Sequence, residues 1–179
     1  MTASPWPAGN GGYRSGVAAS RPSEPNPAEP NPAARTVLLL HGANLNLLGS
    51  REPDVYGSAT LADHMARATA AAAELGLRVE ALQSNHEGAL LDAIHGARNR
   101  CAAIVINPGA FTHYAWSLHD ALAAFDGPVV EVHLSNPNAR EPWRHTSVIA
   151  PVAIGTIAGF GGVGYELAMR AVADALTRP

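Results

Sequence analysis

The chain has 179 residues and no lysine, and all 12 of its basic residues are arginine. A Schiff base with a substrate carbonyl needs a lysine amine, so covalent catalysis of that kind is excluded. A phosphate-binding loop of the G-x-x-x-x-G-K-[ST] type is excluded for the same reason. Chemistry on a carbonyl compound would therefore depend on acid–base groups and on arginine as the cation.

Other features are also scarce. Cys101 is the single cysteine, which excludes an internal disulfide framework and fits a reducing compartment. The eight histidines show no spacing typical of metal ligands, so we expect no metal site. No apolar run is long enough to span a bilayer, and a net charge of -3 gives no reason to expect nucleic-acid binding. These absences predict a cytoplasmic protein with neither a membrane nor a nucleic-acid partner.

The first part of the chain differs in composition from the rest. Residues 1–35 consist mainly of proline, glycine, alanine and serine, with a repeated EPNPA stretch. Such a segment cannot bury enough apolar surface to offset the entropy lost on ordering. We therefore predict a disordered tail over residues 1–35 and a folded catalytic domain over residues 36–179.

Apolar runs and helical periodicity alternate from residue 36 onward. Strands are predicted at 36–41, 77–82, 102–107, 128–134 and 152–158, and helices at 60–75, 87–99, 115–125 and 162–177. Strands that alternate with helices form parallel sheets with right-handed crossovers. The pattern predicts a single flavodoxin-like, doubly wound α/β domain with a five-stranded parallel sheet.

Polar residues follow the first strand, in the loop HGANLNLLGSREPDVYG. Ligands bind at the carboxyl ends of strands in open α/β sheets, which makes Asn44 a candidate site residue. Tyr56 lies five positions after Arg51, and a tyrosine beside a guanidinium can lose its proton well below its usual pKa of about 10. Tyr56 is therefore a candidate general base, although an isolated pair with this spacing is usually an ordinary surface feature.

A second polar group follows the fourth strand, in EVHLSNPNAREPWRH. Glu131 and His133 share one face of an extended strand, so the carboxylate can orient the imidazole and favour its protonated form. The alternative is a core histidine with a structural partner. Leu134 and Ser135 offer backbone N–H groups to an anion. Either Arg140 or Arg144, in the long polar connection, can clamp a carboxylate, unless both only solubilise the surface.

The third group surrounds the end of the third strand, in INPGAFTHYAW. Asn107 can hydrogen-bond hydroxyl groups of a ligand. His113 precedes a predicted helix, where it is either a ligand contact or a helix cap. Asp120 on that helix would ordinarily be a solvated charge. The stretch QSNHEG is interpreted only as the start of a helix.

Taken together, these stretches resemble the type II 3-dehydroquinate dehydratases. The resemblance covers residues 36–176 and rests on ANLNLLGSREPDVYG, QSNHEG, INPGAFTH, EVHLSN with AREPWRH, and AGFGGVGY, in that order. It implies a flavodoxin-like enzyme without metal or organic cofactor, assembled as a homododecamer from four trimers. The implied reaction is the conversion of 3-dehydroquinate to 3-dehydroshikimate, in the shikimate pathway or in quinate catabolism. The missing lysine agrees, since the unrelated type I enzymes use a lysine Schiff base.

The resemblance also implies roles for particular residues. Tyr56 matches the proton acceptor, Arg51 the arginine that activates it, and His133 the proton donor. Asn44 matches the residue that holds a water against the enolate oxygen. The substrate-binding positions are Asn107, His113, Leu134, Ser135 and Arg144, together with Asp120, whose carboxylate reaches a neighbouring subunit's site.

The chain departs from the usual family motif at His41 and Ala43, where Asn and Pro are usual, and at His119. These departures and the tail motivate an alternative hypothesis, a weakly active paralogue that binds quinate-like hydroxy acids. A generic flavodoxin-like receiver is disfavoured, because Asn107 stands where a receiver needs an acidic phosphoacceptor.

Overall fold

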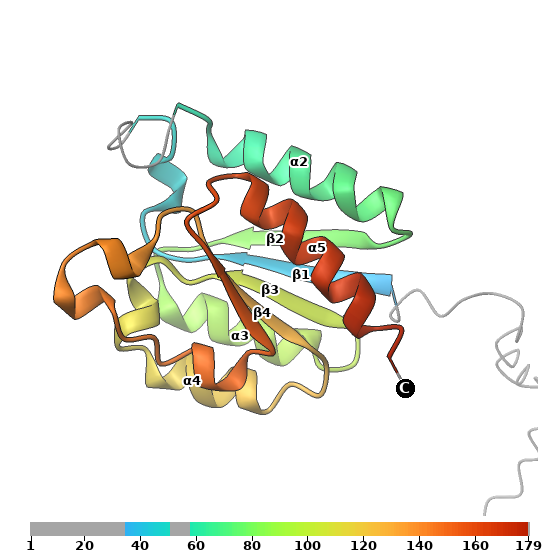
Figure 1. The fold of residues 1–179 in the computed structure, drawn as a ribbon. Helices are drawn as coiled ribbons and strands as arrows, with labels where there is room; N and C mark the ends of the chain where they lie inside the picture. Colours follow the sequence, from blue (N-terminus) through green and yellow to red (C-terminus); the bar gives the residue numbers. More distant parts are fainter. Residues whose placement is uncertain (1–34, 51–57, 179) are drawn as a thin grey trace, which may run out of the picture.

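A five-stranded parallel sheet with strand order β2-β1-β3-β4-β5 forms the centre of the computed structural model, which describes residues 35–50 and 58–178 (Figure 1). The strands are β1 (Thr36–His41), β2 (Arg78–Gln83), β3 (Ala103–Asn107), β4 (Val129–His133) and β5 (Gly155–Ala158). The chain order reverses between β1 and β3, so their carboxyl ends mark the switch point where such sheets bind ligands. The flavodoxin-like prediction is confirmed.

The three central strands differ from the two edge strands as their sequences require. Every residue of β1, β3 and β4 is buried, and these strands are continuous runs of mostly β-branched or large aliphatic residues. The edge strands β2 and β5 carry exposed positions, consistent with the charged residues of β2 and the glycine of β5. A strand covered on both faces is mostly apolar. Its few polar residues, such as Glu131, therefore need hydrogen-bond partners inside the protein.

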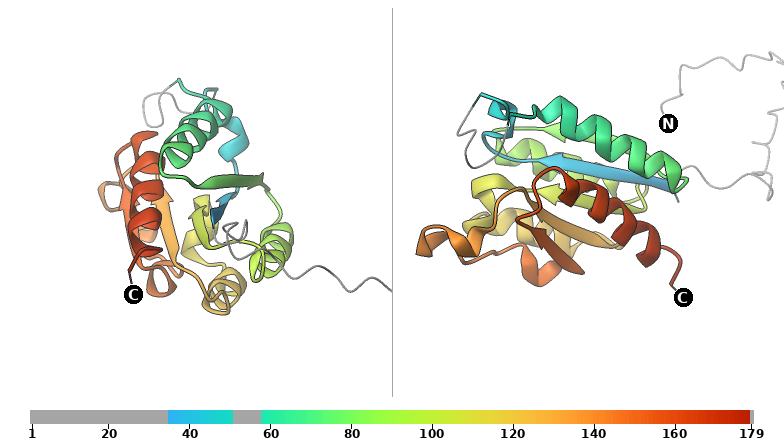
Figure 2. Two further views of the ribbon diagram at one scale, coloured as in Figure 1. Left: turned by 90° about the vertical axis from the view of Figure 1, so that its right-hand side faces the viewer. Right: turned by 45° about the horizontal axis from the view of Figure 1, so that its top comes forward.

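Two helices cover each face of the sheet (Figure 2). Helices α2 (Leu61–Glu74) and α5 (Val163–Ala175) lie together on one face, and α3 (Glu87–Ala97) and α4 (Trp116–Ala123) on the other. Helix α2 begins with a capping box, in which Thr60 and Asp63 satisfy each other's backbone N–H groups. Two separate apolar cores result, one on each side of the sheet.

The predicted boundaries needed small corrections. Strand β5 begins at Gly155 rather than at residue 152, because Ala150–Val152, with Pro151 inside it, forms a 3-10 turn. The connection from β4 to β5 consists of three such turns and no α-helix. Residues 1–34, predicted to be disordered, lie outside the described residues. None of the helices in the described ranges has the length and apolarity needed to cross a membrane.

The loops after β1 and β3 lie so close together that no side chain fits at Gly42, where they meet. The Gly42 N–H donates to the Asn107 carbonyl at 2.8 Å, continuing the β1–β3 pairing beyond the strands. A Cβ atom on Gly42 would lie 1.9 Å from the carbonyl oxygen of Pro108, so only glycine fits there. This contact sets the distance between the two polar loops at the switch point.

We expect Gly42→Ala to lower the free energy of unfolding by about 1–3 kcal/mol, because the new methyl group would force the two backbones apart. Urea unfolding followed by circular dichroism measures the change. The matched control is Gly96→Ala in α3, where a Cβ meets nothing within 4 Å. Removing a helical glycine there should leave stability unchanged or raise it by about 0.5–1 kcal/mol. Equal effects of the two substitutions would contradict the close approach at Gly42.

Candidate active site

A cavity of about 130 Å³ lies at the carboxyl ends of β1, β3 and β4, and the connection from β4 to β5 supplies part of its lining. This is the edge of the sheet at which the sequence predicted a site. Its walls come from three segments that are distant in the sequence, those that follow β1, β3 and β4. The lining residues include Asn44, Asn107, His113, His133, Leu134, Ser135, Arg140 and Arg144.

His133, the last residue of β4, forms one wall of this cavity. Its Nε2 atom lies 2.9 Å from Glu131 Oε1, so the two side chains do share a strand face and contact each other as predicted. Glu131 is completely buried and the His133 side chain is only 10% exposed. The imidazole is thus oriented by a carboxylate that solvent does not reach.

Three hydroxyl groups surround the Glu131 carboxylate. The Thr112 hydroxyl donates to Oε1, the Ser147 hydroxyl lies 2.9 and 3.0 Å from the two oxygens, and the Thr156 hydroxyl donates to Oε2 at 3.3 Å. Burial alone would raise the pKa of the Glu131 carboxyl, but the hydrogen bonds from His133, Thr112 and Ser147 outweigh it and hold the pKa below its ordinary value. Glu131 therefore stays ionised in the interior, with one carboxylate oxygen against His133 Nε2.

The loop after β1 contributes Asn44 to the cavity wall. Asn44 adopts the left-handed conformation with φ of 66°, which asparagine tolerates better than most residues. Its N–H donates to the side chain of Asn85 at 2.8 Å, and Gln83 donates to the Gly42 carbonyl at 3.3 Å and to Asn85 Oδ1 at 3.1 Å. The stretch QSNHEG, to which the sequence assigned no chemistry, thus supports the Asn44 loop.

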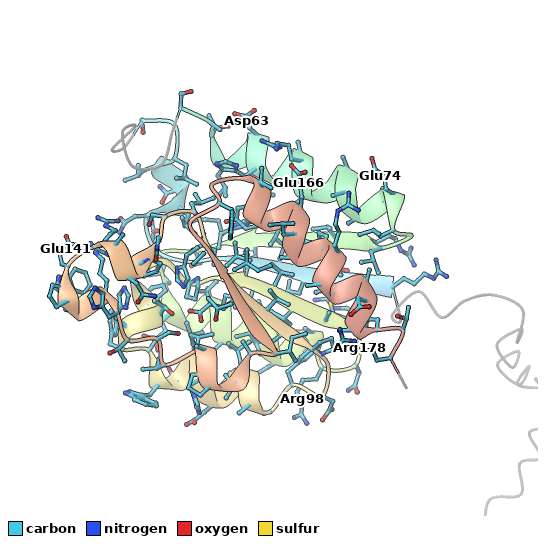
Figure 3. All side chains as sticks on the ribbon, in the orientation of Figure 1. Asp63, Glu74, Arg98, Glu141, Glu166 and Arg178 are labelled. Carbon is cyan, nitrogen blue, oxygen red and sulfur yellow. The ribbon has the colours of Figure 1, made fainter. Side chains whose placement is uncertain are left out.

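Two arginines of the β4–β5 connection share one carboxylate at the edge of the cavity. Arg144 donates to Glu141 at 2.7 Å, and Arg140 lies 3.5 Å from the same Glu141 oxygen. Glu141 lies on the outermost part of this connection, beyond the strand ends (Figure 3). The Arg144 guanidinium stacks 4.0 Å above the Trp143 ring, and His113 meets that ring edge-on. Both arginines remain mostly buried and line the cavity, as a carboxylate clamp requires.

Behind Asn107 lies a group of buried residues that the sequence did not single out for a role. Asn107 donates to the Tyr165 hydroxyl at 3.0 Å, and that hydroxyl lies 3.1 Å from Nδ1 of His41. Burial, with a smaller contribution from nearby His64, lowers the pKa of His41 to about 4. Burial also raises the pKa of the Tyr165 phenol above its ordinary value. Both groups are therefore neutral near pH 7.

Known proteins share this sequence and this fold. Residues 35–173 match the family model described as "Dehydroquinase class II". The chain belongs to the class II dehydroquinase family. The 3-dehydroquinate dehydratase of Desulforudis audaxviator (strain MP104C) is 56% identical over 142 residues, which cover 79% of this chain and 95% of that protein. That of Chelativorans sp. (strain BNC1) is 57% identical over 144 residues, covering 80% and 99%.

A solved structure agrees with the sequence relatives. The type II dehydroquinase of Propionibacterium acnes superposes with a TM-score of 0.76 at 44% identity, covering 78% of this chain and 97% of that chain. The coverage on both sides is high, so the likeness extends over the whole dehydroquinase domain and not only over a shared sheet.

Most of the residues expected to act in a class II dehydroquinase lie at the cavity, and the others lie elsewhere or outside the described residues. The cavity wall includes Asn44, Asn107, His113, His133, Leu134, Ser135 and Arg144, while Glu131 lies behind His133. Tyr56 and Arg51 lie outside the described residues. Asp120 is exposed on α4 and is not part of its own chain's cavity wall. Within residues 35–50 and 58–178, no three acidic, histidine or cysteine side chains are grouped so that they could hold a metal ion.

We expect Thr112→Val, which removes one donor to Glu131 at nearly constant volume, to lower the free energy of unfolding at pH 7 by about 1.5–3 kcal/mol. The folded-state pKa of Glu131 lies below its ordinary 4.5. The stability supplied by the ionised carboxylate is therefore present above that pH and lost as the pH falls through the folded value. The deficit of Thr112→Val should shrink accordingly between pH 7 and the acid limit, in urea titrations at a series of pH values.

Thr177→Val is the control, because the Thr177 hydroxyl is exposed and donates only to a helix carbonyl. It should change stability by less than about 0.5 kcal/mol at every pH. A deficit in Thr112→Val that does not depend on pH would mean that Thr112 contributes packing and not charge stabilisation.

Proposed function

We propose that the protein is a hydro-lyase that converts 3-dehydroquinate to 3-dehydroshikimate by trans elimination of water through an enolate. The observation that carries this is the pairing of His133 with a buried, ionised Glu131, facing a cavity whose other walls carry Asn44 and Asn107. Membership of the class II dehydroquinase family and relatives named 3-dehydroquinate dehydratase support the substrate.

The first chemical step is removal of a proton from the carbon next to the substrate ketone. We assign the base to Tyr56 as its phenolate, with Arg51 stabilising that charge, on the family resemblance. The electron pair of the broken C–H bond moves onto the ketone oxygen and forms an enolate. Asn44 holds a water that donates to this oxygen, and loss of such a donor typically costs about 10²–10³ in rate.

The second step breaks the carbon–oxygen bond. The enolate collapses, the carbon–carbon double bond forms, and the departing hydroxyl takes a proton from His133 and leaves as water. General acid assistance of this kind contributes about 10²–10⁴ in rate. Glu131 supports this step by orienting the imidazole, because its buried carboxylate lies 2.9 Å from Nε2. In a trans elimination, Tyr56 and His133 act from opposite faces of the ring.

The remaining cavity residues bind the substrate. We assign Arg144, which lines the cavity, to the substrate carboxylate, which would compete with Glu141 for the guanidinium. Asn107 and His113 present hydrogen-bonding groups to the ring hydroxyls, and the backbone N–H groups of Leu134 and Ser135 suit an anion. No metal or organic cofactor takes part in any step of this proposal.

The assembly and the cellular role belong to the proposal as well. We place the enzyme in the cytoplasm, in the shikimate pathway to chorismate and the aromatic amino acids or in quinate catabolism. We expect a homododecamer built as a tetramer of trimers. In each trimer, Asp120 of a neighbouring subunit would complete the cavity, which fits its exposure on α4 away from its own chain's site.

Purified protein given 3-dehydroquinate should produce the conjugated enone, which is followed by its absorbance. Tyr56→Phe removes only the phenolic oxygen and should lower kcat by at least about 10³, because the proposed base is lost. Tyr114→Phe is the matched control, since Tyr114 is 58% exposed and does not line the cavity. It should retain full activity.

Two outcomes would count against this assignment. Near-normal turnover by Tyr56→Phe would remove Tyr56 as the base. Folded protein of natural sequence that binds quinate-like acids, yet forms no enone, would favour the binding-only alternative over a dehydratase.

We expect Asp120→Asn to lower kcat/KM about tenfold while the oligomer stays intact, since the neighbour's site loses one charged hydrogen bond of about 1.5 kcal/mol. Light scattering reports the assembly and the enone assay reports activity. The control is Asp126→Asn, an exposed carboxylate in the loop between α4 and β4, away from the cavity at the carboxyl ends of the strands. Full activity of a dissociated Asp120→Asn monomer would overturn the intersubunit role.

A further inference from the structure

A chain of three buried side chains runs from the cavity into the interior. Asn107 at the end of β3, Tyr165 in the first turn of α5, and His41 at the end of β1 are each at most 3% exposed. Asn107 Nδ2 lies 3.0 Å from the Tyr165 hydroxyl, which lies 3.1 Å from His41 Nδ1. Only Asn107 of the three lines the cavity.

The orientation of Asn107 determines the direction of each hydrogen bond between these three side chains. The Gly109 N–H, which can only donate, lies 3.2 Å from one end of the Asn107 carboxamide, so that end is the oxygen. The other end is the NH₂ group, which donates to the Tyr165 hydroxyl oxygen. The phenolic hydrogen must then be donated onward, and His41 Nδ1 is the acceptor within reach.

The number of buried polar atoms left without a hydrogen-bond partner favours the same direction of these hydrogen bonds. With the hydrogen of His41 on Nε2, a single N–H is left without a partner among the described residues. With that hydrogen on Nδ1, the imidazole and Asn107 would both donate to the phenol. The phenolic hydrogen and the Nε2 lone pair would then both be unpaired. Buried polar groups without partners are costly, so the first arrangement is favoured.

Packing prevents the phenol from turning away. The Tyr165 ring meets His41 edge-on at a centroid distance of 5.3 Å and lies 5.9 Å from His64 of α2. A Cβ atom on Gly162, just before α5, would come within 2.5 Å of His64, so this glycine lets the helix approach closely enough. These two imidazole contacts hold the Tyr165 ring and keep its hydroxyl aimed at Asn107.

We propose that Tyr165 and His41 are positioning residues that, together with the Gly109 N–H, hold the Asn107 carboxamide in one orientation, so that it offers one N–H and one lone pair to a substrate hydroxyl. A hydroxyl group both donates and accepts, and so matches this pair of atoms. A freely rotating amide would present the wrong end for part of the time. The inference rests on the proposed function, because it assigns Asn107 to the recognition of a ring hydroxyl of the substrate.

The test begins with Tyr165→Phe, which keeps the ring and removes the oxygen. We expect kcat/KM for 3-dehydroquinate to fall about tenfold, mainly through KM, as one well-oriented hydrogen bond weakens. The same substitution in an Asn107→Ala background should cause no further loss, because the group it positions is absent. Tyr114→Phe serves as the control at an exposed site. Equal losses in the two backgrounds would make Tyr165 a purely structural residue and overturn the proposal.

A second measurement needs neither activity nor a substitution. Nitrogen-15 NMR of labelled protein of natural sequence should show His41 with its hydrogen on Nε2 near pH 7, and an imidazole with the hydrogen on Nδ1 would refute the proposed direction. If that protein forms no enone while His41 is protonated on Nε2, the proposed reaction fails but the network stands. If enone forms and the kinetic cycle is additive, the reaction stands and the positioning role fails.

Discussion

The parallel pairing of β1 with β3 is the contact on which the rest of the molecule depends. It places His41 beside Asn107 in register and continues through the hydrogen bond from Gly42 to the Asn107 carbonyl. Because the chain crosses to opposite faces of the sheet after these two strands, a cavity is left at their carboxyl ends, beyond the close contact between Gly42 and Pro108. The cavity, the Asn44 loop and the buried Tyr165 group are all arranged around this pair of strand ends.

Two ionisable side chains inside the sheet, Glu131 and His41, differ in charge for different physical reasons. Glu131 remains charged because three hydroxyls and an imidazole compensate for its lost hydration. His41 remains neutral because burial, with a smaller contribution from nearby His64, lowers its pKa to about 4. The charged group lies behind the proposed acid and the neutral one behind a proposed binding residue. His133, as the proposed proton donor, has a charged partner, whereas Asn107, as a proposed binding residue, needs only neutral groups that fix its orientation.

Much of the fold could be predicted from the sequence. Strand β1 was placed to the residue, and the other strands and helices were placed within three residues at each end, since long apolar runs and Pro or Gly at their ends are local signals. The largest error among the strands was the start of β5. Pro151 lies within an apolar stretch, and only pairing with the neighbouring strand determines which of its residues belong to β5. The contact between Glu131 and His133 was also predictable, since two residues on one strand face lie together whatever surrounds them.

The sequence by itself determined the alternation of strands and helices, the residue types at the strand ends, and the chemistry that an absent lysine excludes. These follow from local periodicity and from the functional groups that the chain contains. Only the tertiary structure decided that Thr112, Ser147 and Thr156 converge on Glu131, or that Tyr165 links Asn107 to His41. These contacts join residues up to 124 positions apart, so no local pattern encodes them. They exist because buried polar groups must find partners wherever the packed sheet and helices bring them together.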